Sequence, residues 1–94
     1  MSAPCEHLES VPNDPKPRQG CGPCLAKGDT WVHLRFCVAC GAVGCCDESP
    51  NRHARAHAAT PGHPVARSAE PDEMWAFCYP HDDGIEIEGP EIWA

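Results

Sequence analysis

Pairs of cysteine and histidine give this 94-residue sequence its clearest chemical signal. Eight cysteines and six histidines are present, and twelve of them form six pairs or near-pairs: Cys5/His7, Cys21/Cys24, Cys37/Cys40, Cys45/His53, His57/His63 and Cys78/His81. Because Zn²⁺ takes four thiolate or imidazole ligands in a tetrahedron, two pairs complete one site. The spacing therefore predicts three closed zinc sites, and it leaves only His33 and Cys46 outside them.

Two other uses of the cysteines are weaker. An even number of cysteines also fits a secreted disulfide scaffold, but disulfides would not need histidines at ligand spacing. Residues 21–24 read CGPC, as in thioredoxin-type redox motifs, which need a preceding strand and a long following helix. Here a proline-bearing loop precedes the motif and Gly28 ends any helix early, so we interpret it as a zinc knuckle.

Histidine spacing leaves one question open. His53 and His57 lie four residues apart, so a single ion could take both, or each could serve a different ion beside the helix. The metalloprotease pattern requires Glu after the first histidine, whereas Ala54 stands there. Filled coordination spheres leave no position for a reactive water, and Cys46 with His33 is a poor nucleophile pair. We therefore expect that the protein is not an enzyme.

The elements that must position these ligands are short. Two Phe, one Tyr and three Trp stand against eleven Pro and eight Gly, so little apolar surface can be buried, and small domains of this kind usually need metals or disulfides. We predict an α+β fold, a small zinc-stapled domain with a short antiparallel sheet and one main helix at about 50–59, with Ser49 as N-cap and Pro50 at the first helical position. Strands are expected at 30–36, after the turn at 41–44, at 64–68 and at 74–79.

The chain is expected to be a single domain over 1–94, with a core at 5–81 and an acidic tail at 82–94. Apolar and acidic residues alternate in the tail from Ile85 to Glu88, and the tail either pairs as an edge strand or stays mobile.

The formal charge of −7 disfavours nucleic acid as a partner, although Arg52, Arg55 and Arg67 could form a local basic spot for one carboxylate. No apolar run approaches the roughly 18 residues of a membrane span and no secretory signal stands at the start, so we expect a cytoplasmic monomer without membrane contact.

The order of motifs resembles the UBP-type zinc finger, the ubiquitin-binding zinc finger of deubiquitinating enzymes and of one histone deacetylase; stand-alone chains of this type resemble its bacterial members. The matching features are Cys-x-His, C-x₂-C, W-V-x-L, C-x₂-C-G-x-V-x-C, His-x₃-His, Gly-His-Pro and Cys-Tyr, spread from Cys5 to His81. The resemblance implies three interleaved zinc sites: Cys5, His7, Cys78 and His81; Cys21, Cys24, Cys45 and His53; and Cys37, Cys40, His57 and His63. His81 stands where the family usually has cysteine, and Asp82 could substitute for it.

The resemblance also implies a function, capture of a free Gly-Gly C-terminal tail of ubiquitin or of another protein or peptide. Trp31, Phe77 and Tyr79 match positions of the aromatic pocket, with Trp75 close by. The arginine expected two residues after Cys45 is replaced by Asp47, and Arg52 is the substitute that we expect to hold the carboxylate. The alternative is a structural zinc adaptor without a tail pocket, which docks a partner through other surfaces such as the acidic tail.

Overall fold

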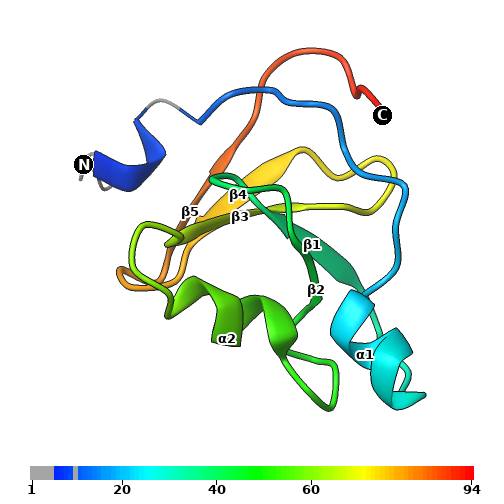
Figure 1. The fold of residues 1–94 in the computed structure, drawn as a ribbon. Helices are drawn as coiled ribbons and strands as arrows, with labels where there is room; N and C mark the ends of the chain where they lie inside the picture. Colours follow the sequence, from blue (N-terminus) through cyan, green and yellow to red (C-terminus); the bar gives the residue numbers. More distant parts are fainter. Residues whose placement is uncertain (1–5, 10) are drawn as a thin grey trace.

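One antiparallel sheet of five short strands forms the centre of the fold (Figure 1). The computed structural model describes residues 6–9 and 11–94. The strands run in the spatial order β2-β1-β3-β4-β5, and each neighbouring pair is antiparallel. Their bounds are β1 (Leu34–Cys37), β2 (Val43–Cys45), β3 (Val65–Ser68), β4 (Trp75–Cys78) and β5 (Asp83–Glu86). The expected α+β class with a short antiparallel sheet is confirmed.

Helices and terminal segments cover the sheet from opposite sides. The main helix α2 (His53–Ala58) packs on one face, and the segments before α1 and after β5 run along the other side (Figure 1). A second helix of the same length, α1 (Gly22–Lys27), contacts β2 and ends at Gly28, whose φ of 73° lies in the left-handed region that glycine favours. A 3-10 turn, η1 (Glu6–Leu8), contacts β4. None of the described helices is long and apolar enough to cross a membrane.

The predicted start of the main helix is wrong by several residues. Ser49 does not cap it, because its buried hydroxyl accepts a hydrogen bond from the Val32 N–H at 2.9 Å. The helix begins instead at His53, whose N–H donates to Cys45 Sγ at 3.1 Å. A sulfur atom thus takes the place of the expected hydroxyl. Since the Val32 N–H is used in this way, the strand expected from residue 30 begins only at Leu34.

The remaining strands lie close to their predicted positions. β3 begins one residue later than predicted, and β4 is one residue shorter than predicted at each end. The tail forms an edge strand, which is one of its two expected states, and β5 pairs with β4 from Trp75↔Glu86 to Cys78↔Asp83. Its first residues are therefore fixed parts of the sheet.

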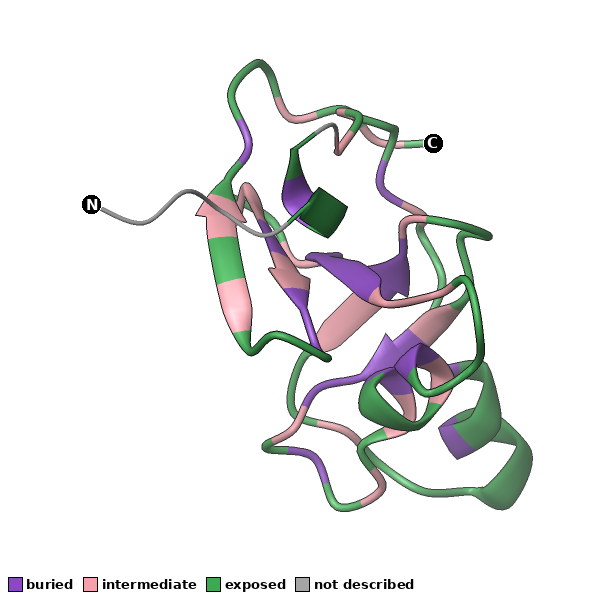
Figure 2. Ribbon diagram, turned by 90° about the vertical axis from the view of Figure 1, so that its left-hand side faces the viewer, coloured by how far each residue is buried: buried purple, intermediate pink, exposed green. Residues whose placement is uncertain are grey.

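The interior consists of three small clusters rather than one core. Buried residues gather in the central strands, and the outer sides of the helices are exposed (Figure 2). Two cations complete the interior. Lys16 is fully buried and donates to the carbonyl oxygens of Glu70 at 2.6 Å and Glu73 at 2.7 Å. Arg67, expected in a surface basic spot, is 1% exposed and lies over the ring of Phe36.

Candidate metal centres and a basic aromatic face

The first candidate metal centre contains Cys21, Cys24, Cys45 and His53. Cys21 and Cys24 lie at the start of α1, Cys45 ends β2, and His53 begins α2. His53 Nδ1 lies 3.3 Å from the sulfurs of Cys21 and Cys24 and 3.4 Å from that of Cys45. Zinc bond lengths of about 2.3 Å to sulfur and 2.0–2.1 Å to nitrogen give tetrahedral edges of about 3.8 Å between sulfurs and 3.6 Å between sulfur and nitrogen. The Cys24–Cys45 sulfur separation of 3.9 Å fits such an edge.

The second centre contains Cys37, Cys40, His57 and His63. Cys37 ends β1, Cys40 lies in the turn before β2, His57 is on α2, and His63 precedes β3. Cys37 Sγ is 3.2 Å from His63 Nδ1, and Cys40 Sγ is 3.3 Å from His57 Nε2. The two ring nitrogens are 3.3 Å apart, the edge expected for two imidazoles on one zinc.

These two centres show whether His53 and His57 belong to one metal site or to two. His53 and His57 belong to different clusters although they are four residues apart on α2. Of the two arrangements left open by the sequence, the structure has the one with a histidine for each ion. Helix α2 thereby connects the two centres, because it supplies one ligand to each.

The third centre is formed by His7, Cys78 and His81. Cys78 Sγ lies 3.1 Å from His7 Nδ1 and 3.4 Å from His81 Nδ1. Cys78 is fully buried, whereas both histidines are exposed. Cys5, the predicted fourth member, lies outside the described residues. His81 rather than Asp82 joins the cluster among the residues that the structure describes.

The donor sets fit zinc in type as well as in spacing. The ligand atoms within each cluster all lie within 4.8 Å of one another, and thiolate with imidazole is the donor combination of structural zinc sites. Burial raises the pKa of the Cys37 thiol, which disfavours its thiolate unless a cation is bound beside it. Three Cys/His clusters can therefore each hold a zinc ion.

The two residues left over from the pairs remain outside these clusters. His33 is exposed on the surface, and its carbonyl oxygen accepts the Cys46 N–H at 3.0 Å. Cys46 is buried, with its sulfur 3.5 Å from the Ser49 hydroxyl. Burial opposes ionisation of this thiol, but hydrogen bonds from Ser49 and from neighbouring backbone groups bring its pKa below the ordinary value.

A second candidate site lies on the α2 side of the sheet. Trp75, Phe77 and Tyr79 alternate along β4 and its end, so their side chains share one face. The guanidinium of Arg35 on β1 lies 5.0 Å from the Trp75 ring centre, 5.9 Å from that of Phe77 and 5.8 Å from that of Tyr79. Its Nη1 also donates to the Tyr79 hydroxyl at 2.8 Å. We call these four residues the Arg35 aromatic cluster.

More arginine charge lies next to this cluster. The guanidinium of Arg55 also lies over the Tyr79 ring, 5.0 Å from its centre. It donates two hydrogen bonds to the Asp47 carboxylate. The hydrogen bond from Arg55 is the main reason that the pKa of Asp47 is lowered, and Arg35 and Arg52 lower it further. Three arginines thus act on a single aspartate in a chain whose net charge is −7.

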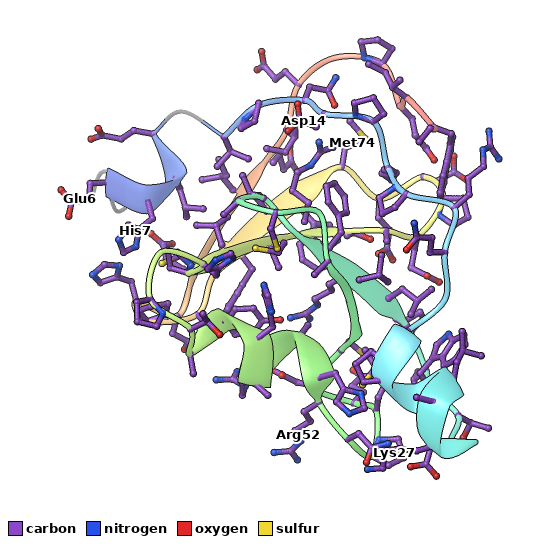
Figure 3. All side chains as sticks on the ribbon, in the orientation of Figure 1. Glu6, His7, Asp14, Lys27, Arg52 and Met74 are labelled. Carbon is purple, nitrogen blue, oxygen red and sulfur yellow. The ribbon has the colours of Figure 1, made fainter. Side chains whose placement is uncertain are left out.

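The predicted peptide-binding residues are only partly brought together. Phe77, Tyr79 and Trp75 form the cluster, whereas Trp31 packs against the first metal centre. Arg52 is exposed before α2 and points away from the body of the protein (Figure 3). Sequence reasoning missed Arg35, the cation that contacts all three rings. A charged residue between Leu34 and Phe36 in an apolar strand was the signal that could have revealed it.

Comparisons with known proteins agree with this geometry. A solution NMR structure of protein RPA1320 from Rhodopseudomonas palustris is similar, with a TM-score of 0.76, 37% identity, and coverage of 99% of this chain and 98% of that one. No curated protein matches the sequence significantly. Residues 21–89 match the family described as the Zn-finger in ubiquitin-hydrolases and other protein. With its three Cys/His clusters and this match over most of its length, the chain belongs to that zinc-finger family.

Proposed function

We propose that this zinc-binding domain is a non-catalytic interaction module that captures the free C-terminal tail of a protein or peptide. The proposal is carried by one observation, the position of Arg35 among Trp75, Phe77 and Tyr79. Aromatic rings can wall a narrow slot for a peptide backbone, and an arginine guanidinium binds a carboxylate through paired hydrogen bonds. Arg35 is half-buried, so desolvation would strengthen that contact.

Asp47 is compatible with an anionic ligand because its charge is already paired. Both of its carboxylate oxygens accept hydrogen bonds from Arg55. Arg35 then remains beside the aromatic rings to bind the ligand, and the exposed Arg52 adds positive charge near Asp47. The proposal gives Arg35 the carboxylate-binding role that was expected of Arg52. Glycine is the residue expected at the end of the tail, because a residue without a side chain lets the terminal carboxylate approach Arg35 most closely beside the rings.

The ligand class follows from the family's description, which mentions ubiquitin hydrolases. Ubiquitin, a ubiquitin-like protein or another chain with a Gly-Gly end would each supply a flexible tail and a free carboxylate. The same chemistry is present in a short synthetic peptide, which therefore separates recognition of the tail from recognition of the folded protein.

NMR titration of the zinc-loaded protein provides the test. A peptide that ends in Gly-Gly with a free carboxylate should shift the amides of Arg35, Phe77 and Tyr79, and its C-terminal amide should not. Ubiquitin should act like the free peptide only while it retains its last two residues. Arg35→Met should abolish the shifts, whereas Arg18→Met, at an exposed arginine bound to the Ala94 carbonyl, should retain them. Tail capture would be ruled out if the peptide with a free carboxylate and its C-terminal amide bound equally well. It would also be ruled out if millimolar peptide caused no shifts of the amide signals.

A further inference from the structure

Cys40 is the only exposed cysteine among those that the structure describes. It lies in the turn between β1 and β2, where its sulfur stands 3.3 Å from His57 Nε2 at the surface of the second centre. The other described cysteines are buried, including Cys37 of the same centre. Small molecules in solution can therefore reach a sulfur ligand of the second centre without any opening of the fold.

A surface groove beside this cysteine gives such molecules access. Its volume is about 320 Å³, and both Cys37 and Cys40 line it together with mostly apolar residues, among them Phe36. The charged residue in the lining is the acid Asp14. A small uncharged molecule therefore suits the groove better than an anion does.

Cys37 places a second sulfur next to that of Cys40. Two residues separate these cysteines, and the Gly41 N–H donates to the Cys37 carbonyl oxygen at 2.7 Å, which closes the turn between them. The two sulfurs lie within 4.8 Å of each other. The Cys37 sulfur is therefore within reach of an oxidised Cys40.

We propose that Cys40 is a modification site for hydrogen peroxide and other small two-electron oxidants, and that its oxidation empties the second centre. The Cys40 thiolate attacks one peroxide oxygen, so that an S–O bond forms, the O–O bond breaks and hydroxide leaves. The Cys37 thiolate then attacks the Cys40 sulfur, which forms the S–S bond and expels a second hydroxide. Two thiolates thereby give two electrons to one peroxide. His57 and His63 alone remain as described ligands, too few to retain zinc.

The loss of this ion changes the support of α2. His57 on α2 and His63 before β3 are held together by the second centre. Because α2 has only six residues, it depends on its ligands and packing rather than on its own stability. Ala58 near its end packs in one buried cluster with Tyr79. Oxidation therefore loosens the end of α2 and reaches a ring of the Arg35 aromatic cluster. This inference goes beyond the proposed function and does not depend on it.

Treatment of the zinc-loaded protein with a small molar excess of hydrogen peroxide tests this inference. Native mass spectrometry should show that a single ion is lost first and that one disulfide forms with it. Peptide mapping should assign that disulfide to Cys37 and Cys40, and NMR spectra should show the earliest changes at the amides of His57, His63 and Tyr79. A thiol reductant supplied together with zinc should restore the original spectrum.

Variants identify the sulfur responsible. Cys40→His keeps a zinc ligand but removes the exposed sulfur, so this variant should retain its ions over the time in which the wild type loses one. Cys46→Ala, which removes a buried cysteine outside the three clusters, should respond like the wild type. The inference is overturned if the first ion leaves another centre, or if zinc is lost without the disulfide between Cys37 and Cys40. A wild-type response of Cys40→His would overturn it as well.

Discussion

The guanidinium of Arg35 donates a hydrogen bond to the Tyr79 hydroxyl over 2.8 Å, and this contact joins β1 to the end of β4 across the strand β3 between them. The bond orients Arg35 within the aromatic rings, and it gives the cluster an optical reporter. Tyr79 is the only tyrosine of the chain, so tyrosinate absorbance reads this position alone.

We predict that Tyr79 titrates above its ordinary pKa. Burial raises the pKa and outweighs the opposing effect of Arg35. In Arg35→Met the pKa should rise further, since the cation that favours tyrosinate is lost. Because the pKa is higher in the folded state, stability from the neutral phenol is present below the unfolded value of about 10 and is lost as the pH rises through the folded value. An unchanged or lower pKa in Arg35→Met would contradict this coupling.

Removal of the Asp47 charge should strengthen capture of a carboxylate. In Asp47→Asn, Arg55 loses its ion pair and becomes available to the ligand. Because both partners are substantially exposed, we expect a gain of only about three- to fivefold in affinity for a peptide ending in Gly-Gly. Isothermal titration calorimetry of the wild type and the variant with this peptide measures the gain in affinity. Glu48→Gln removes the same charge from an exposed neighbour and should have a smaller effect.

Zinc should be released in an order that follows ligand exposure. The exposed histidines of the third centre predict that its ion leaves first, and the fully buried cysteines of the first centre predict that its ion leaves last. Native mass spectrometry should show three ions per chain, which a chromophoric chelator removes stepwise. His81→Ala should lower the stoichiometry to two. The order is wrong if the first ion lost perturbs the amides of α1 before those around Cys78.

The contact between α2 and β2 leaves no room for a methyl group at Gly44. A Cβ there would lie 2.6 Å from the Ala54 nitrogen and 2.9 Å from its Cα, both backbone atoms that cannot yield separately. Gly44→Ala should therefore lower the free energy of unfolding by about 1–3 kcal/mol, measured by denaturation of the zinc-loaded protein. Gly22→Ala is the matched control, because a Cβ at Gly22 meets nothing within 4 Å. Equal stability of the two variants would contradict the close approach.

The buried Lys16 should contribute to stability through its hydrogen bonds. Lys16→Met keeps the length of the side chain but leaves the carbonyl groups of Glu70 and Glu73 without their donor. We expect a loss of about 1–3 kcal/mol in the free energy of unfolding. Lys27→Met changes an exposed lysine and should stay within about 0.5 kcal/mol of the wild type. A loss as small as that in Lys16→Met would show that these bonds contribute little.

The sequence predicts best where its signals are local and repeated. The spacing of cysteine and histidine predicts three zinc sites, and short runs bounded by turn residues predict strands close to β3 and β4, because both signals are carried by neighbours along the chain. The start of α2 could not be predicted in this way. A serine-proline pair is an ordinary helix signal, but the Ser49 hydroxyl is used by Val32 and a sulfur atom receives the first helical N–H.

The residues missed by the sequence depend on distant parts of the chain. Lys16 lies in a polar, proline-bearing segment, and only acceptors more than fifty residues away make it a buried residue. The importance of Arg35 depends on strand order, which brings β1 and β4 to either side of β3. Arg67, in contrast, was expected at the surface and lies inside, because carbonyl groups of the N-terminal segment receive its N–H groups.

The different surroundings of the two lysines have a practical consequence for chemical labelling. Lys16 is enclosed on all sides, whereas the side chain of Lys27 is 57% exposed at the end of α1. An amine-reactive fluorophore should therefore modify Lys27 and spare Lys16 while the protein is folded. A dye attached there would lie at the end of α1, and modification of Lys16 would report the moment at which the fold opens.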